Sequence, residues 1–322
     1  MTASVQVAIH ASQFPESVRR DLRTSLRTRR VNHKFHYDSV KQTQKWLALH
    51  EAHSPARYDA DCRSTYDRAF AEAAAQIKSR QVQVIGLGCG GGQKDTGLIK
   101  ALRARGKKIS YTPCDVSVAM VLVARQAARA WLPAKKCFPF VCDLATADDL
   151  QKLAVARSPA LVTFFGMIPN FEPRQILPKL AALLRLDDFL LFSANLAPGA
   201  DYAAGMKMIR PQYDNPLTRD WLMAFLLDLG VARSDGELRF TIETGGLGLQ
   251  RVMARFHFRR ARQIKVDGGH FAFACGETMQ LFFSYRYTPV RVARLLAQHG
   301  LKVHRQWLAA SGEEGVFFCR RK

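Results

Sequence analysis

The chain has 322 residues, of which 48% are hydrophobic, and a formal net charge of +21. This composition predicts a folded protein of about two domains, and the lack of an apolar run of about 18 residues argues against a membrane span. Seven cysteines form no CxxC pair and no cluster with zinc-ligand spacing. We therefore expect reduced thiols, no metal and a cytoplasmic protein without a membrane partner.

The first 80 residues are predicted to be mostly helical. Residues 12–30 carry Val18, Leu22 and Leu26 at a spacing of four, which indicates one apolar helical face. Residues 41–53 and 59–79 also have helical patterns.

From residue 82 the pattern alternates between apolar strands and helices. Strands are predicted at 82–87, 108–115, 137–144, 160–168 and 188–196, with helices at 95–106, 118–132 and 174–184. Such alternation favours a parallel sheet covered on both faces.

The alternation is lost near Pro198 and resumes near residue 277 with "ETMQLFFSYRY", a helix from Pro289 and two final strands. The stretch between contains helix-like and strand-like pieces. The fold class predicted is α/β, with a Rossmann-like core interrupted by an α+β insertion on which the N-terminal segment packs.

A glycine-rich loop follows the strand at 82–87, with five glycines between Gly86 and Gly92. Glycine-rich turns between a strand and a helix let a ligand approach the backbone. The loop lacks the GK[ST] ending of a P-loop, and it matches a dinucleotide GxGxxG only weakly. The third interpretation is the GxGxG of S-adenosylmethionine-dependent methyltransferases, with Gly88, Gly90 and Gly92 as its glycines.

Two acids end the next two predicted strands. Asp115 follows the glycine loop at the spacing of a ribose-binding acid, and a carboxylate can accept bonds from two adjacent hydroxyls. Asp143 ends "FPFVCD", where methyltransferases commonly bind the adenine amino group. The alternative for each acid is an N-cap of the following helix.

Several motifs along nearly the whole chain now point to one family. They are "KFHYDS", "SPAR", "GLGCGGGQKD", "YTPCDVS", "FFGMIPNFEP", "YDNPLTRDWL", "GETMQLFFSYRY" and "LLAQHGLKVHRQWL". In order and spacing the chain resembles the histidine-specific Nα-methyltransferases of ergothioneine biosynthesis, together with their fungal relatives that act on a prenylated tryptophan.

The resemblance implies S-adenosylmethionine as cofactor and a division into four segments. Residues 1–58 and 198–275 would form a substrate-binding domain, and residues 59–197 and 276–322 the methyltransferase core. Lys94, Asp115 and Asp143 match cofactor-contacting positions.

The resemblance also implies roles for substrate-side residues. Tyr37 matches a tyrosine near the substrate amino group, and Asn170 an asparagine that holds the amino and carboxylate end; these two are the predicted catalytic residues. Tyr213 matches a tyrosine bonded to the carboxylate, and Ser284 a serine beside the imidazole.

The chain departs from the family where the substrate side chain would bind. Phe282 stands where the histidine enzymes keep a glutamate that bonds the imidazole, and an imidazole N–H left unpaired would cost about 1–3 kcal/mol. Phe282 and Met253 would favour an aromatic or aliphatic side chain instead. His53 falls on an expected tyrosine and is either a new polar contact or a surface residue. Gly86 replaces the acid that usually opens the glycine loop.

The predicted reaction is therefore N-methylation of an amino acid or related small amine other than plain L-histidine. A neutral, well-aligned amine needs no strong general base. Two alternatives stay open: a nucleic-acid methyltransferase, which the basic charge invites but the scattered basic residues disfavour, and a cofactor-binding protein that has lost activity. We expect a monomer or weak homodimer.

Overall fold

The computed structural model describes residues 4–154 and 158–322, which form two compact units. Unit 1 comprises residues 1–12, 55–196 and 287–322, and unit 2 comprises residues 13–54 and 197–286. The sequence placed the N-terminal residues with the substrate-binding segment and the return to the core at residue 276. Both boundaries differ, because residues 1–12 belong to unit 1 and residues 278–286 form a strand of unit 2.

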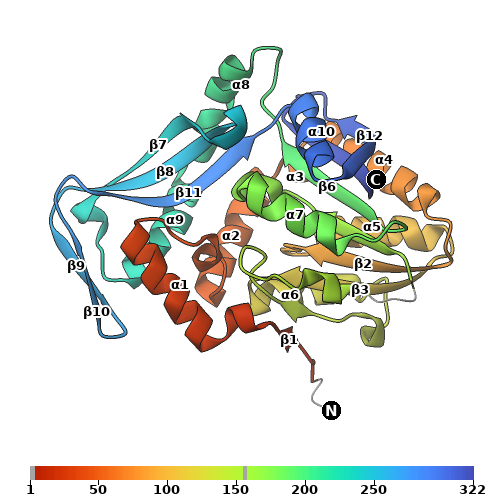
Figure 1. Ribbon diagram of the computed structural model, residues 1–322, viewed down its shortest axis with the longest axis horizontal. Coiled ribbons are helices and arrows are strands. Elements are labelled where there is room, and N and C mark those ends of the chain that lie inside the picture. Colours follow the sequence, from red (N-terminus) through yellow and green to blue (C-terminus); the bar gives the residue numbers. More distant parts are fainter. Residues whose placement is uncertain (1–3, 155–157) are drawn as a thin grey trace. The chain divides into compact units, whose positions relative to one another are not determined.

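Unit 1 is built on one eight-stranded sheet with the order β1-β4-β3-β2-β5-β6-β13-β12 (Figure 1). Its strands are β1 (Ala8–Ile9), β2 (Gln81–Leu87), β3 (Lys108–Asp115), β4 (Phe140–Val141), β5 (Ala160–Phe164), β6 (Phe189–Asn195), β12 (Leu301–Leu308) and β13 (Glu314–Arg321). The strands from β1 to β6 pair in parallel, whereas β13 is antiparallel to both β6 and β12. This is a doubly wound α/β core, as the sequence predicted.

Helices connect these strands and cover the sheet. They are α3 (Pro55–Tyr58), α4 (Ala60–Gln76), α5 (Gln93–Ala104), α6 (Val118–Ala128), α7 (Pro173–Leu183) and α10 (Pro289–Gln298), with short 3₁₀ turns at η1 (Ala11–Gln13), η3 (Ala134–Lys136), η4 (Leu150–Leu153) and η5 (Ile168–Asn170). The small side chains of Ala69, Ala73 and Ala74 let α4 approach α5 and the sheet, where Val82 and Val84 of β2 join the same buried cluster. Because strand side chains alternate, Gln83 and Ile85 point to the opposite face.

Unit 2 has a three-stranded antiparallel sheet and a separate hairpin. The sheet has the order β11-β8-β7, and β9 pairs with β10 (Figure 1). The strands are β7 (Gly236–Thr244), β8 (Gln250–Phe258), β9 (Arg262–Val266), β10 (Gly269–Phe273) and β11 (Thr278–Arg286). The prediction that the parallel sheet resumes at residue 277 is wrong, because β11 pairs along its length with β8.

The helices of unit 2 pack on one face of its sheet. They are α1 (Pro15–Thr28), α2 (Val40–His53), α8 (Tyr202–Ile209) and α9 (Pro216–Asp228), with 3₁₀ turns η2 (His33–His36), η6 (Arg210–Tyr213), η7 (Arg233–Asp235) and η8 (Gly246–Gly248). Their apolar side chains share a buried cluster with Phe240, Val252 and Phe282 of the sheet. This core orders β11, which carries Phe282 and Ser284, and η2, which Tyr37 follows directly.

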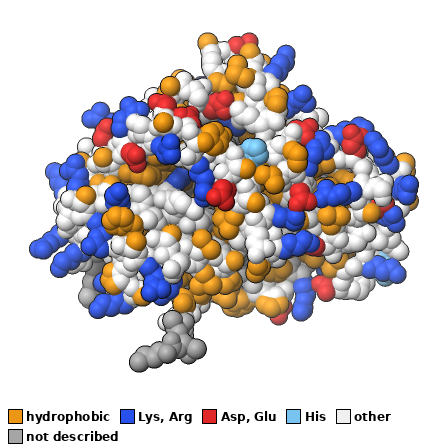
Figure 2. Space-filling model, turned by 180° about the vertical axis from the view of Figure 1, so that it is seen from behind, with side chains coloured by type: hydrophobic (Ala, Val, Ile, Leu, Met, Phe, Trp, Pro, Cys, Tyr) orange, Lys and Arg blue, Asp and Glu red, His pale blue; other side chains and the backbone are white. Residues whose placement is uncertain are grey.

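The surface is strongly charged. Figure 2 shows Lys and Arg side chains scattered over one face of the molecule, with Asp and Glu side chains between them. Among the described residues, no helix is both long and apolar enough to cross a membrane.

Candidate functional site

The glycine loop lies where the strand order of the unit 1 sheet reverses. From β2, the chain proceeds outward through β3 and β4 on one side and through β5 and β6 on the other. In open α/β sheets, ligands bind outside the carboxyl ends of the strands at this reversal. The loop leaves the carboxyl end of β2 and enters α5, so it occupies that position.

Two glycines of the loop are required by its geometry. Gly88 and Gly92 have φ values of 62° and 76°, which L side chains rarely adopt. A Cβ on Gly88 would lie 2.5 Å from Cγ of Met167, and one on Gly92 would lie 2.7 Å from Cα of Ala124. Without side chains at residues 88 and 92, the backbone of this loop packs closely against Met167, in the loop that follows β5, and against Ala124 of α6.

Asp115 at the end of β3 holds the glycine loop. Its Oδ2 accepts a hydrogen bond from the N–H of Gly90 at 3.0 Å, and its Oδ1 accepts one from Ser117 at 3.1 Å. The N-cap of α6 is Ser117, so the alternative role considered for Asp115 falls to its neighbour. Burial raises the pKa of Asp115 to about 6, although the backbone N–H bonds oppose the shift.

Asp143 follows β4, the next strand outward. Its Oδ1 accepts a hydrogen bond from the N–H of Ala145 at 2.9 Å, which forms a local turn rather than a helix cap. The side chain is buried, with 4% of the residue exposed. Asp115 and Asp143 thus stand at the carboxyl ends of neighbouring parallel strands.

A buried carboxylate lies beside Gly86. Asp95, in the first turn of α5, accepts hydrogen bonds from Tyr111 of β3 at 2.7 Å and from Thr163 of β5 at 2.6 Å. A Cβ on Gly86 would lie 2.0 Å from Oδ2 of Asp95. The carboxylate therefore fills the space of a side chain at residue 86 and joins the two strands that flank β2, while burial raises its pKa.

Lys94 lies in a second polar cluster of unit 1. Its Nζ is 2.5 Å from the hydroxyl of Tyr66 and 3.7 Å from Oε1 of Glu314, and the Tyr66 hydroxyl also donates to Glu314. Burial and the Glu314 carboxylate raise the pKa of Tyr66 well above its usual range. The Lys94 side chain is 24% exposed.

Asn170 ends η5, in the loop after β5. The loop turns at Gly166, whose N–H donates to the hydroxyl of Ser193 at 2.9 Å, and the N–H of Asn170 donates to the carbonyl of Met167 at 3.0 Å. Because β2 and β5 are neighbouring parallel strands, this loop and the glycine loop lie side by side. These features fit S-adenosylmethionine, the cofactor that the sequence predicted. They are the glycine loop, Asp115, which is bonded to that loop, and Asp143 at the end of the next strand.

Tyr37 lies in unit 2, where its hydroxyl is 3.1 Å from Nε2 of His33. The pKa of His33 is lowered to about 3 by burial and by nearby His36, so the imidazole is neutral at pH 7. A neutral imidazole can accept the phenol proton through Nε2. In that arrangement the phenol oxygen of Tyr37 acts as the donor toward His33.

Tyr213 and Ser284, which were predicted to contact different ends of the substrate, lie side by side. Their hydroxyl oxygens are 2.9 Å apart, and Nε of Arg286 donates to the Tyr213 hydroxyl at 3.1 Å. Ser284 and Arg286 are two residues apart on β11, so they point to the same face. The guanidinium, which is held near two hydroxyls, provides positive charge for a carboxylate.

Phe282 is part of a group of rings on this same face. Its ring centroid lies 5.6 Å from that of Trp221, 5.7 Å from that of His33 and 6.4 Å from that of Tyr213. The residue is 8% exposed. Its surroundings are therefore aromatic.

Met253 and His53 are not brought into this group. Met253 pairs with Phe283 across the β8–β11 ladder, and directly paired residues point to the same face. Met253 therefore points away from the face of Phe282, so the two residues predicted to favour an aromatic or aliphatic side chain do not line one surface. His53 is the exposed last residue of α2.

Sequence reasoning did not identify several polar residues of these clusters, among them His33, Asp95, Arg286 and Glu314. A signal existed for Asp95. Gly86 stands where relatives keep an acid, and Asp95 is an acid in the first turn of the helix that follows the loop. A signal also existed for Arg286, which follows Ser284 at the period of one strand face. Glu314 gave no local signal, since its partners are distant in sequence.

Comparison with known proteins identifies the family of the chain. The family model described as "Histidine-specific methyltransferase, SAM-dependent" matches residues 18–218 and 248–321. No curated protein matches the chain.

Solved structures resemble the chain at low identity. The CcbJ methyltransferase from Streptomyces caelestis is 14% identical with a TM-score of 0.41, over 80% of this chain and 96% of that one. The 1,6-didemethyltoxoflavin-N1-methyltransferase of Burkholderia thailandensis, solved with 1,6-didemethyltoxoflavin and S-adenosylhomocysteine, is 11% identical with a TM-score of 0.45, over 87% of each chain. The glycopeptide N-methyltransferase MtfA, solved with sinefungin, is 15% identical with a TM-score of 0.39, over 80% of this chain and 93% of that one.

Proposed function

Because the chain belongs to the family of histidine-specific, S-adenosylmethionine-dependent methyltransferases, we propose that it methylates the amino nitrogen of an amino acid or related small amine whose side chain is aromatic or apolar. L-histidine is not the expected substrate. Unit 2 is proposed to bind this substrate, and unit 1 holds the cofactor through Gly88, Gly90, Gly92, Asp115 and Asp143, with Lys94 close by.

The observation that carries the proposal is the setting of Phe282. Its ring lies among those of His33, Trp221 and Tyr213, at the position that resemblance assigns to an imidazole-binding acid. An apolar or indole-like side chain loses no hydrogen bond there, whereas an imidazole would bury an unpaired N–H at a cost of about 1–3 kcal/mol. Ser284, Tyr213 and Arg286 on the same face supply hydroxyls and charge for the polar end of an amino acid.

The chain's own residues have to orient the amine and keep it neutral. When bound, S-adenosylmethionine supplies an electrophilic methyl group on a sulfonium. Tyr37 and Asn170 are proposed to accept hydrogen bonds from the amine N–H groups, which aims the nitrogen lone pair. Neutral His33 beside the Tyr37 hydroxyl supports this role, because it orients the phenol as a donor toward the imidazole.

The test is methyl transfer to a panel of amines. The protein is incubated with isotope-labelled S-adenosylmethionine and equal concentrations of L-histidine, L-tryptophan, L-phenylalanine, histamine and tryptamine, and products are detected by mass. We expect N-methylation of an aromatic member in preference to L-histidine, and loss of at least about tenfold in kcat/KM for Asn170→Ala. Preference for L-histidine would overturn the substrate class, and full activity of Asn170→Ala its proposed role.

The same experiment separates the alternative functions. Cofactor binding without transfer to any amine would favour a protein that has lost catalysis. Methylation of RNA or DNA, with binding that weakens steeply as salt rises, would favour the nucleic-acid function. The basic residues are spread along the chain rather than gathered in one block, which supports the small-molecule proposal, since a nucleic-acid site is expected to gather basic residues.

A further inference from the structure

The segment before α1 forms part of the unit 1 sheet. β1 pairs in parallel with β4, with Ala8 opposite Phe140 and Ile9 opposite Val141. This segment precedes residue 18, where the match to the family model begins. Because the strands are parallel, the residues that follow β1 lie beside those that follow β4, and Asp143 is among the latter.

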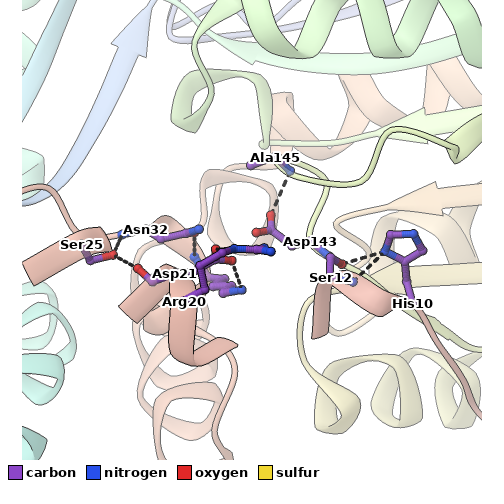
Figure 3. A network of polar contacts seen from close by, with 9 residues as sticks. His10, Ser12, Arg20, Asp21, Ser25, Asn32, Asp143 and Ala145 are labelled. Carbon is purple, nitrogen blue, oxygen red and sulfur yellow. Dashed lines mark hydrogen bonds and ion pairs between the residues drawn. The ribbon is translucent and has the colours of Figure 1, made fainter. Parts of the chain in front are cut away.

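A chain of hydrogen bonds connects this segment to Asp143 (Figure 3). The hydroxyl oxygen of Ser12 accepts a bond from the backbone N–H of Asp143 at 2.9 Å, and it lies 2.9 Å from Nδ1 of His10. Nε2 of His10 lies 3.0 Å from Oδ1 of Asp149. The carboxylate can only accept, so Nε2 is the donor to Asp149. Nδ1 accepts the backbone N–H of Ser12 at 3.1 Å, and as an acceptor it can also take the hydrogen bond of the Ser12 hydroxyl. The oxygen of Ser12 is thereby directed at the Asp143 N–H.

Asp143 is consequently held on both its main chain and its side chain. Ser12 bonds its N–H, and Ala145 bonds its carboxylate. Ser12 and Asp143 are 6% and 4% exposed, so water does not readily replace these bonds. Along the carboxyl edge of the sheet the order is the β5 loop, the glycine loop, Asp115, Asp143 and then Ser12. Ser12 therefore stands next to the residue predicted to bind adenine, on its outer side.

We propose that Ser12, oriented by His10 and Asp149, is a positioning residue for the adenine end of the cofactor. It fixes the main chain at Asp143 so that the carboxylate meets the exocyclic amino group. The inference concerns the cofactor and does not depend on the identity of the methyl acceptor. Its failure is therefore distinguishable from failure of the proposed substrate.

The experiment compares two ligands that differ at the adenine amino group. Binding of S-adenosylhomocysteine and of S-inosylhomocysteine, which has a carbonyl there, is measured by calorimetry for the full chain and for Ser12→Ala. We expect Ser12→Ala to weaken the adenine ligand about three- to tenfold, the effect of one hydrogen bond, and to leave the inosine ligand within about twofold. Ser79→Ala, whose hydroxyl bonds the carbonyl of Gln81 at the start of β2, is the matched control and should change neither affinity.

If Ser12 were only structural, Ser12→Ala would lower the affinity for both ligands equally, and this outcome would overturn the proposal. Unchanged affinity for both ligands would overturn it as well. If Ser12→Ala does not fold, His10→Gln serves as the second variant, because it leaves the Ser12 hydroxyl in place but removes its imidazole partner. It should show a smaller loss in the same direction, again confined to the adenine ligand. An equal loss for both ligands in this variant would also overturn the proposal.

Discussion

Replacing Gly86 by alanine should test whether the Asp95 carboxylate occupies the space of a side chain at residue 86. The new Cβ would lie 2.0 Å from Oδ2 of Asp95 and 3.3 Å from Cε2 of Tyr111. β2 is paired with β3 on one side and β5 on the other, so its backbone cannot move away. The Asp95 carboxylate must therefore be displaced.

The cost follows from the bonds that this displacement breaks. Asp95 accepts hydrogen bonds from Tyr111 and Thr163, and bonds to a charged group contribute about 1.5–3 kcal/mol each. Relaxation of the helix would recover part of this sum, so we expect a loss of about 3 kcal/mol. For a domain of about 150–250 residues, each kcal/mol lowers Tm by about 2–4 °C. Gly86→Ala should thus lower the Tm of unit 1 by about 6–12 °C.

The assay is thermal unfolding of a double-mutant cycle with Asp95→Ala. If the two residues compete for one space, Gly86→Ala should cost less than about 1 kcal/mol once the carboxylate is gone, because coupled neighbours are not additive. Gly246→Ala is the matched control, since a Cβ there has no atom within 4 Å. The reasoning is refuted if Gly86→Ala lowers Tm equally with and without the Asp95 carboxylate, or leaves Tm unchanged.

Three further predictions concern the other clusters. Burial raises the pKa of Asp115 to about 6, so its carboxyl is protonated and accepts hydrogen bonds less well below that pH. Calorimetry should therefore show that S-adenosylhomocysteine binding weakens by up to about tenfold per pH unit below pH 6 and stays constant above pH 7. A flat affinity profile from pH 5 to 8 would contradict the role of Asp115. Phe282→Glu should restore an imidazole acceptor and raise kcat/KM for L-histidine relative to an aromatic amino acid by at least about tenfold; an unchanged ratio in the folded variant would count against the specificity role. Asp21→Asn should lower the free energy of unfolding, measured by chemical denaturation, by about 3–5 kcal/mol. The reason is that the Asp21 carboxylate is 2.6 Å from the Lys34 ammonium and the two side chains are 10% and 1% exposed. Asp228→Asn, which breaks an exposed pair with Lys41, should lower it by less than about 1 kcal/mol.

The arrangement of the predicted cofactor site could be foreseen because the strand order of a parallel sheet decides which residues become neighbours. A parallel sheet aligns the carboxyl ends of its strands, so residues that follow successive strands must become neighbours. Asp115 and Gly90 illustrate this, since they are distant in sequence and yet joined by a bond of 3.0 Å. By contrast, β1 pairs only two residues with β4, and a two-residue strand leaves no periodic signal. The role of Ser12 beside Asp143 could therefore not be foreseen.

The arrangement of Phe282, Ser284 and Arg286 depends on a register shift in β11. The alternation of apolar and polar residues in the sequence does not reveal this shift. In a regular strand, Met279 and Phe282 would point to opposite faces, because they are separated by an odd number of residues. In β11, however, Met279 pairs with Phe256 and Phe282 with Ala254. These partners are two residues apart on β8, so both residues face the unit 2 core.

The shift comes from an extra residue in β11, Leu281, which lies at the irregularity between Gln280 and Phe282. Its carbonyl accepts a hydrogen bond from Nε2 of buried His36 at 2.7 Å. Such bulges redirect side chains near functional sites. Here the bulge turns Phe282 toward the rings of His33 and Trp221. Ser284 and Arg286 follow on the same face and contact Tyr213, whereas Met253 lies opposite Phe283 on the other face. The set of β11 residues that share the face of Phe282 is thus fixed by one inserted residue and the histidine that binds its carbonyl.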